Sequence, residues 1–529
     1  MQEIITRQEE YRILEKRVNS FLEGFRQNIA LIGPSSCGKT YLVEQFFKTR
    51  SLDDKALIVY VDLEFLSFAE FIRASFASLL FHFLKKHSCS DYDLDALILQ
   101  AQTHIPQTTE KIKHILGMLD SKEKASFDWV TGVFDAFIAE TKTKTLLVVD
   151  NFTAIRSFPR RVLSEFAKYI ITQKDILFVF ISKNVKAAEQ LLSQELNILF
   201  GSFEKIYMDS FSHIEAEFYL NRHLIDKTSA SLIKFLVELT DGFPLYLDII
   251  TKELLKNPDQ TLDATTFFAR LARLLVDARS PLLMTFKNKL ALVKASSRDT
   301  FLINPLLITI AEGYTRRKDL ISLLKIDAKT LNAKLNKLTE LDLVTKNGSF
   351  FFVSDKLFSF WLSSAFKTMV NVPFIFRGDN RRAVEERLSQ RFEEFRQASL
   401  QDNCKRFIDL VQMFRDDTVK TQRKSLSLPQ IQRLKIVPTH SKDMTYIIGE
   451  AKQYYLILAF KDGFVEETDI LEFSNRCSYF RHKPPKKIFI TLKKPDATAK
   501  VLAKEKRLFF WEKEDVNLLL RLYNRPSII

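Results

Sequence analysis

One eight-residue segment near the start of the chain reads Gly33-Pro34-Ser35-Ser36-Cys37-Gly38-Lys39-Thr40. It fits the spacing G-x-x-x-x-G-K-[ST], in which the two glycines let the backbone curve so that successive N–H groups point at one bound anion. We expect Lys39 to reach the β- and γ-phosphates of a nucleotide and the Thr40 hydroxyl to bind Mg²⁺. All eight residues are therefore predicted to form a phosphate-binding loop for ATP with Mg²⁺.

The residues on both sides of this segment have the patterns that such a loop requires. Residues 28–32 form a short apolar run typical of a buried strand, and residues 41–47 have apolar side chains at helical spacing. A strand, a loop and a helix in this order place the bound phosphates at the amino end of the helix.

Further apolar runs predict the rest of an α/β domain. Strands are expected at residues 56–62, 145–150, 175–182 and 205–208, after an amphipathic lead-in helix within residues 1–27. Continuous apolar runs are typical of strands that are buried on both faces of a parallel sheet. Residues 66–140 are rich in Phe and predict helices.

The ends of two predicted strands carry the other candidate site residues. Asp150 ends an apolar strand, so its carboxylate is expected to hold Mg²⁺ beside the loop. Asn151 follows, and an amide can hold a water molecule but cannot take its proton. Lys39, Asp150 and Asn151 are the candidate catalytic residues, and because Asn151 is not an acid they favour nucleotide binding over fast hydrolysis. Ser182, Lys183 and Asn184 end another strand, where they either sense the γ-phosphate or form an ordinary strand-to-helix turn.

The middle of the chain is predicted to be helical and then to form a winged helix. Helices are expected across residues 211–280 and, within residues 298–362, at 305–311, 316–324 and 328–341. Residues 343–353 predict a hairpin, the wing, with an Asn347-Gly348 turn. In the third helix Lys329, Lys334 and Lys337 lie off the apolar face, as in a helix that contacts DNA. A wing that contacts only protein is the alternative.

Length and composition limit the classes of protein to which the chain can belong. A chain of 529 residues predicts several domains. The net charge of +14 includes ten Lys and Arg against two Asp and Glu within residues 481–510, which favours an anionic partner such as DNA. No apolar run is long enough to span a membrane. Four widely spaced cysteines fit neither a zinc site nor a disulfide scaffold and indicate a cytoplasmic setting.

These motifs together resemble the archaeal-type ATPases of the signal-transduction ATPase (STAND) group, a branch of the AAA+-like P-loop proteins. The resemblance rests on a lead-in, Walker A and B motifs, a lid motif and a winged-helix signature, in order Arg7-Gln8-Glu9-Glu10, Gly33–Thr40, Val148-Val149-Asp150-Asn151, Asp241–Leu247 and Ser354–Trp361. It implies that Pro244 contacts the nucleotide base. It also implies an ATPase domain at 1–210, a helical lid at 211–285, a winged helix at 286–370 and a further domain at 371–529.

The family often ends in a nuclease-like domain of the PD-(D/E)xK type, and residues 446–452 resemble its Glu-x-Lys half. Glu450 and Lys452 would be the remnants of that site. The acidic partner is expected on the preceding strand, where Lys435 stands instead, and a lysine repels a divalent ion. Asp443, Glu393 and Glu394 are the other acids that could supply the missing carboxylate. The resemblance therefore implies a degenerate α/β nuclease-like domain, which strand 456–460 also fits.

The sequence favours an ATP-dependent switch with slow hydrolysis that signals to DNA or to a partner protein. Two alternatives remain, an ATP-regulated DNA nuclease and a non-enzymatic DNA-binding regulator. The oligomeric state is left open.

Overall fold

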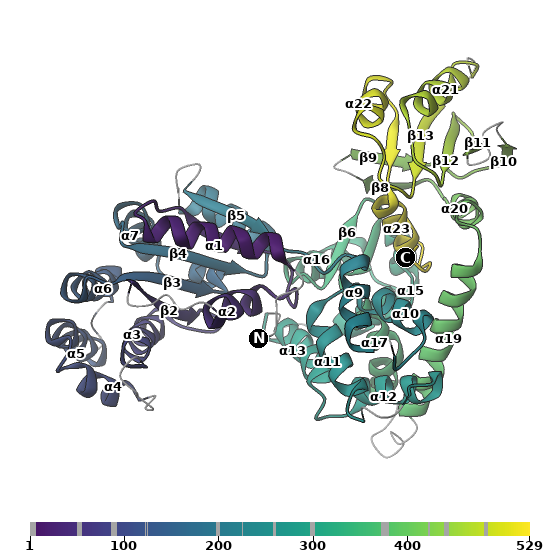
Figure 1. Cartoon of the computed structure of the whole chain (residues 1–529). Coiled ribbons are helices and arrows are strands. Elements are labelled where there is room, and N and C mark those ends of the chain that lie inside the picture. The colour runs from purple at the N-terminus through teal and green to yellow at the C-terminus, as the bar shows by residue number, and fades with distance from the viewer. Residues whose placement is uncertain are drawn as a thin grey trace. The chain divides into compact units, whose positions relative to one another are not determined.

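The computed structural model in Figure 1 describes residues 7–49, 55–85, 93–121, 123, 125–196, 202–224, 226–257, 261–296, 302–371, 380–421, 424–438, 444–480 and 485–528. The chain divides into two units, residues 1–211 with 243–245 and residues 212–242 with 246–529. Among the described residues, no helix is both long and apolar enough to cross a membrane. Asp443 lies outside these ranges.

A five-stranded parallel sheet forms the centre of the first unit, in the order β2-β3-β4-β1-β5. Its strands are β1 (Asn28–Ile32), β2 (Ala56–Asp62), β3 (Lys144–Asp150), β4 (Ile176–Ser182) and β5 (Phe203–Tyr207). All five match predicted strands within about two residues. Strand β4 lies between β1 and β3, so loop 33–40 follows a strand, β1, that does not pair directly with β3, which ends at Asp150. The α/β fold class is confirmed.

Helices cover both faces of this sheet, because successive strand residues point to opposite sides. Leu146 and Val148 face a core that includes α1 (Gln8–Leu22) and α2 (Lys39–Thr49), whereas Leu147 and Val149 face the larger core. The helices α3 (Phe68–Lys85), α4 (Leu94–Ala101), α5 (Pro106–Asp120), α6 (Phe127–Thr141) and α7 (Arg160–Thr172) contribute to that larger core.

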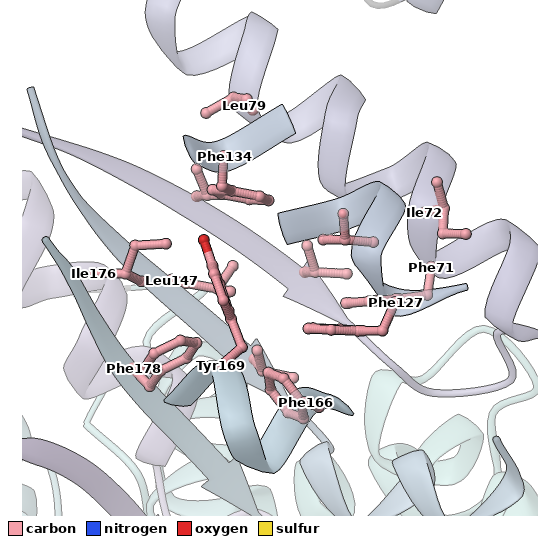
Figure 2. Close-up of a cluster of buried hydrophobic side chains, with 14 of the residues drawn as sticks. Phe71, Ile72, Leu79, Phe127, Phe134, Leu147, Phe166, Tyr169, Ile176 and Phe178 are labelled. Carbon is pink, nitrogen blue, oxygen red and sulfur yellow. The ribbon is translucent and has the colours of Figure 1, made fainter. Parts of the chain in front are cut away.

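Aromatic side chains from separate elements meet in the larger core (Figure 2). Phe166 of α7 lies between Phe127 and Phe178, with ring centroids 4.9 and 5.9 Å apart. The Phe-rich segment predicted as helical is thus part of the packing that supports β3 and β4. The remaining elements of this unit are η2 (Phe152–Ser157), α8 (Val185–Gln190) and η3 (Leu191–Glu195).

The second unit begins with the predicted lid and winged helix. Its elements are α9 (His213–Leu224), α10 (Ala230–Thr240), α11 (Pro244–Leu254), α12 (Ala264–Val276), α13 (Pro281–Ser296), α14 (Ile303–Ala311), α15 (Arg317–Leu324), α16 (Ala328–Glu340), β6 (Val344–Asn347), β7 (Phe350–Val353), α17 (Lys356–Trp361), η4 (Leu362–Phe366), α18 (Lys367–Asn371) and α19 (Asn380–Leu400). The predicted Asn347-Gly348 turn is wrong by one residue. Asn347 pairs with Phe350, so Gly348 and Ser349 form the turn.

The C-terminal part holds a mixed five-stranded sheet in the order β10-β11-β12-β13-β14. Its elements are α20 (Asn403–Gln412), β8 (Asp417–Thr421), β9 (Lys424–Leu428), β10 (Arg433–Pro438), β11 (Met444–Glu450), β12 (Tyr455–Lys461), α21 (Glu467–Cys477), β13 (Pro485–Thr491), α22 (Ala497–Glu505), β14 (Phe509–Trp511) and α23 (Lys513–Leu522). Phe350 and Phe352 of the wing belong to the same core as this sheet. The wing and the C-terminal part therefore share one hydrophobic core.

Candidate functional site

Gly33 is the point at which the loop leaves the sheet. Its N–H donates to Ser182 O at 3.1 Å, and Met208 N donates to the preceding Ile32 O at 2.8 Å. A Cβ at Gly33 would lie 1.8 Å from Met208 O. Only glycine fits here, because the neighbouring backbone fills the space that any side chain needs.

Two left-handed residues curve the loop before α2 begins. Ser36 has φ of 68° and Gly38 has φ of 90°. Backbone of this kind directs successive N–H groups to one side and forms a concavity that binds anions. The first turn of α2 follows directly, with Leu42 N donating to Gly38 O at 2.9 Å. The loop therefore fits a phosphate group at the amino end of a helix.

The Lys39 side chain is buried inside this loop. Its Nζ donates to Gly33 O at 2.9 Å and to Pro34 O at 2.7 Å, and it lies 3.4 Å from Cys37 Sγ. Burial lowers the pKa of Lys39, and the nearby Lys183 charge lowers it further, while Cys37 and Asp150 oppose the shift. The ammonium thus lies at the base of the loop, where the oxygens of a bound phosphate would compete with the two carbonyls.

Thr40 and Asp150 come together as the sequence predicts for a magnesium site. Thr40 Oγ1 donates to Asp150 Oδ2 at 2.6 Å, and Asp150 is buried. Tyr60 also donates to Asp150 Oδ2, at 3.0 Å, and burial together with the Asp150 charge raises the pKa of Tyr60. A hydroxyl and a carboxylate suit Mg²⁺, which takes its other ligands from water and substrate phosphates. In the described residues no group of three or more His, Cys, Asp or Glu could hold a metal.

Asn151 has a partner that the sequence analysis missed. Its Nδ2 donates to Asp62 Oδ1 at 2.8 Å, and its own backbone has φ of 49°. Asp62 ends β2 and pairs in register with Asp150 at the end of β3. The signal was present in the sequence, because both apolar strands end in Asp and the carboxyl ends of parallel strands meet at one edge of the sheet.

The three residues at the end of β4 differ in what they contact. Asn184 caps α8 by accepting from Ala187 N at 2.8 Å, and Ser182 Oγ donates to Asn184 O at 3.1 Å. Lys183 instead pairs with Glu64, in the loop after β2. Lys183 is therefore the one of the three predicted sensor residues whose charge acts on Lys39.

Pro244 and Arg7 both lie beside the loop within the first unit. A Cβ at Gly38 would lie 4.0 Å from Pro244 Cβ, and Leu245 N donates to Ser36 O at 3.4 Å. Arg7 donates to Asp209 O and to Cys37 O, and its guanidinium lies 5.1 Å from the centre of the Phe211 ring. The lid motif and the lead-in thus contact the same loop.

The predicted DNA-contacting helix α16 has the expected faces. Leu331, Leu335 and Leu338 are buried. Lys329 is exposed, whereas Lys334 and Lys337 are half-buried, and Lys337 lies 3.8 Å from Glu340.

The wing, in contrast, contacts another part of the same chain. Ser349 N donates to Thr418 O at 2.8 Å, and Asn347 exchanges side-chain hydrogen bonds of 2.9 and 2.7 Å with Lys420 O and N. The tip of the wing therefore pairs with β8 of the C-terminal part.

Of the residues compared with a nuclease site, Glu450 and Lys435 lie on the predicted strands, β11 and β10. Glu450 ends β11 opposite Arg433, and Lys435 lies opposite Ile448, so both cations share a sheet face with Glu450. Lys452 follows the strand and is exposed. Glu393 and Glu394 pair with Arg396 and Arg391 on α19. Two cations lie on the same sheet face as Glu450, and their charge opposes metal binding there.

No protein-family model matches the chain, and no curated protein matches it. Several solved structures are similar. One is a Walker-type ATPase of Pyrococcus abyssi, with 18% identity, coverage of 68% of this chain and 96% of that chain, and a TM-score of 0.48. Another is the ORC2 protein of Aeropyrum pernix, solved as ADPNP–ADP complexes, with 12% identity, coverage of 75% and 96%, and a TM-score of 0.42.

A third similar structure is the ORC1 protein of Aeropyrum pernix, solved in complex with DNA. It has 13% identity, coverage of 74% of this chain and 94% of that chain, and a TM-score of 0.37. At TM-scores below 0.5 these likenesses add nothing to the assignment of function, which comes from the residues of the site.

Proposed function

We propose that this chain binds ATP with Mg²⁺ at loop 33–40 and is a slow ATPase that acts as a nucleotide-dependent switch. One observation carries the proposal: the Thr40 hydroxyl lies 2.6 Å from the Asp150 carboxylate, beside a loop in which Gly33 has no room for a side chain. A surface turn without a ligand, which is the alternative for this segment, would require neither the Thr40–Asp150 contact nor the lack of room at Gly33.

Each residue of the proposed nucleotide site then has its own role. Backbone N–H groups of the loop bind the phosphates, Lys39 provides a positive charge, and Thr40 with Asp150 holds Mg²⁺. When bound, Mg²⁺ neutralises charge on the phosphate oxygens. Pro244, which lies beside Gly38, is proposed to contact the base. Asn151 can hold a water molecule but itself supplies no carboxylate to take the proton of that water.

The switch is proposed to act through the turn that follows α10. Asp241 and Gly242 both have positive φ, of 52° and 70°, and they directly precede the segment 243–245 that lies beside the loop. Asp241 itself pairs with Lys356 at 3.2 Å and with Arg521 at 3.0 Å. A change at Pro244 would therefore reach the winged helix and α23 through the backbone and these ion pairs.

Nucleotide binding tests the proposal directly. We expect the native chain to bind radiolabelled ATP with Mg²⁺ and Lys39→Met to bind it at least tenfold more weakly. Lys48→Met is the matched control, because Lys48 lies on the same helix α2 with its side chain 67% exposed. The proposal is wrong if native protein fails to bind ATP, or if both variants bind it equally well.

DNA binding by α16 is a second proposed function, supported by Lys329, Lys334 and Lys337 away from its buried leucines. The C-terminal part is proposed to be a degenerate nuclease-like domain, because Arg433 and Lys435 share the sheet face of Glu450. A partner protein is the alternative target of the switch.

A further inference from the structure

The carboxyl edge of the first sheet carries two aspartates in neighbouring positions. Asp62 and Asp150 are register partners at the ends of β2 and β3. Their surroundings differ, because Asp150 is buried and accepts hydrogen bonds from Thr40 and Tyr60, whereas Asp62 is exposed. The Asp150 carboxylate belongs to the proposed magnesium site, and the Asp62 carboxylate is open to water.

The Asp62 carboxylate is held from one side only. Asn151 Nδ2 and Glu64 N donate to it at 2.8 and 2.9 Å, and both bonds end on Oδ1. Among the hydrogen bonds of the described residues none ends on Oδ2, so this oxygen is available to a water molecule. The amide bond with Asn151 fixes the direction of the carboxylate.

We propose that Asp62 provides the carboxylate that position 151 lacks and acts on the water that attacks ATP. The inference rests on the proposed nucleotide site and assigns a further residue to it. Asp62 and Asn151 form an acid–amide pair across two adjacent strands, with the acid on β2 and the amide directly after β3.

The other nearby carboxylates are committed elsewhere. Asp150 accepts from the Thr40 hydroxyl and from Asn151 N, at 2.6 and 2.7 Å. Glu64 forms the ion pair with Lys183. Asp62 has no cationic partner among the described ion pairs, so no cation competes with a water molecule for its carboxylate.

The chemical step balances with the groups present. The water oxygen forms a bond to the γ-phosphorus while the bond from that phosphorus to the β,γ-bridging oxygen breaks, and ADP leaves with the electron pair. Asp62 Oδ2 takes the proton of the water and later returns it to solvent or to the released phosphate. The side-chain oxygen of Asn151, Oδ1, accepts from the other hydrogen of the water and so orients it.

Two substitutions separate this role from a structural one. Asp62→Asn keeps the size of the side chain and removes its charge. The double variant Asp62→Asn with Asn151→Asp exchanges the two groups and keeps an acid–amide pair. Asp175→Asn is the control, because Asp175 is an exposed acid before β4 at the opposite edge of the sheet.

Turnover and ATP binding are measured on the full chain with Mg²⁺. We expect Asp62→Asn to lower kcat about 100-fold, as loss of a general base does, with the Kd for ATP changed less than about twofold. The exchanged variant should recover at least tenfold of kcat, and Asp175→Asn should match the native chain.

Three results would overturn the inference. These are native turnover in Asp62→Asn, no recovery in the exchanged variant, and loss of ATP binding together with turnover in Asp62→Asn, which would make Asp62 a binding residue. A native chain that binds ATP without turnover would also refute it. Absence of ATP binding in the native chain would instead refute the proposed function and remove the basis of this inference.

Discussion

Arg316 holds Asp417 through two parallel hydrogen bonds, from Nε to Oδ1 at 2.8 Å and from Nη2 to Oδ2 at 2.9 Å. The pair joins the residue before α15 to the first residue of β8. Tyr523 also donates to Asp417, at 2.7 Å, and its ring lies under the guanidinium. Burial opposes ionisation of Asp417, but Arg316 and Tyr523 outweigh it and lower the pKa of this carboxyl. Residues 316 and 417, in the predicted winged helix and in the C-terminal part, are therefore joined by an ion pair whose carboxylate is buried and whose guanidinium is partly buried.

Removing the cation of this pair should destabilise the second unit. Arg316→Met leaves Asp417, whose side chain is 4% exposed, without its charged partner, and we expect a loss of about 3 kcal/mol. Arg382→Met is the control, since Arg382 pairs with Glu386 at 3.4 Å on the surface and should cost well under about 1 kcal/mol. Thermal unfolding measures both. Equal shifts in melting temperature would show that the Arg316 pair contributes no more than a surface pair.

The close approach of the wing to β8 predicts a strong effect of a single methyl group. A Cβ at Gly348 would lie 1.9 Å from Thr418 O, and the residue has φ of 57°. Gly348→Ala should therefore destabilise the chain by about 2 kcal/mol or more, through the steric conflict and the backbone strain. Gly24→Ala tests strain alone, because Gly24 has φ of 104° and no atom within 4 Å of the added Cβ. Urea unfolding should rank Gly348→Ala as clearly more damaging, and the reverse order would contradict the observed packing.

The strands and the position of loop 33–40 between β1 and α2 were predictable from the sequence because their signals are local. Each buried strand is a continuous apolar run, and the loop is a fixed spacing of residues. The position of Asp62 beside Asp150 depends on strand pairing between residues 88 positions apart, and its one signal in the sequence is that both apolar runs end in Asp. The contact of the wing with β8 depends on the hydrogen bond from Ser349 N to Thr418 O, which no local pattern in the sequence predicts.

Because Met208 O lies so close to Gly33, we expect a side chain at position 33 to weaken nucleotide binding, although it removes no contact with the nucleotide. Gly33→Ala would force its Cβ against Met208 O, so the loop must shift away from β5. We expect ATP binding to fall at least tenfold, measured by titration calorimetry. Gly132→Ala is the control, because Gly132 lies in α6 with no atom within 4 Å of the added Cβ, and alanine favours a helix. Unchanged ATP affinity in Gly33→Ala would count against the loop as the binding site.

The ion pairs of Asp241 predict a stability that depends on pH. Burial opposes ionisation, but Lys356 and Arg521 outweigh it and lower the pKa of Asp241 to about 2. A lowered pKa stabilises the folded chain above the unfolded value near 4, and this contribution is lost as the pH falls through 2. Asp241→Asn should therefore cost about 2 kcal/mol at pH 7, and the difference from native protein should shrink below pH 4. Thermal unfolding of both proteins at pH 7, 5 and 3 measures this, and a constant difference would refute the assignment.

Salt dependence can separate DNA binding by α16 from a general effect of the net charge of +14. Each lysine that contacts a phosphate contributes about 0.9 to the slope of log affinity against log salt. We expect the triple change of Lys329, Lys334 and Lys337 to Gln to lower that slope by about 2 to 3, measured by fluorescence anisotropy on duplex DNA. A matched triple change at Lys168, Lys174 and Lys205, three exposed lysines of the first unit, should leave the slope nearly unchanged. Equal changes of slope in both triple variants would attribute DNA binding to net charge. Absence of DNA binding by the native protein would indicate that a partner protein is the target of the switch.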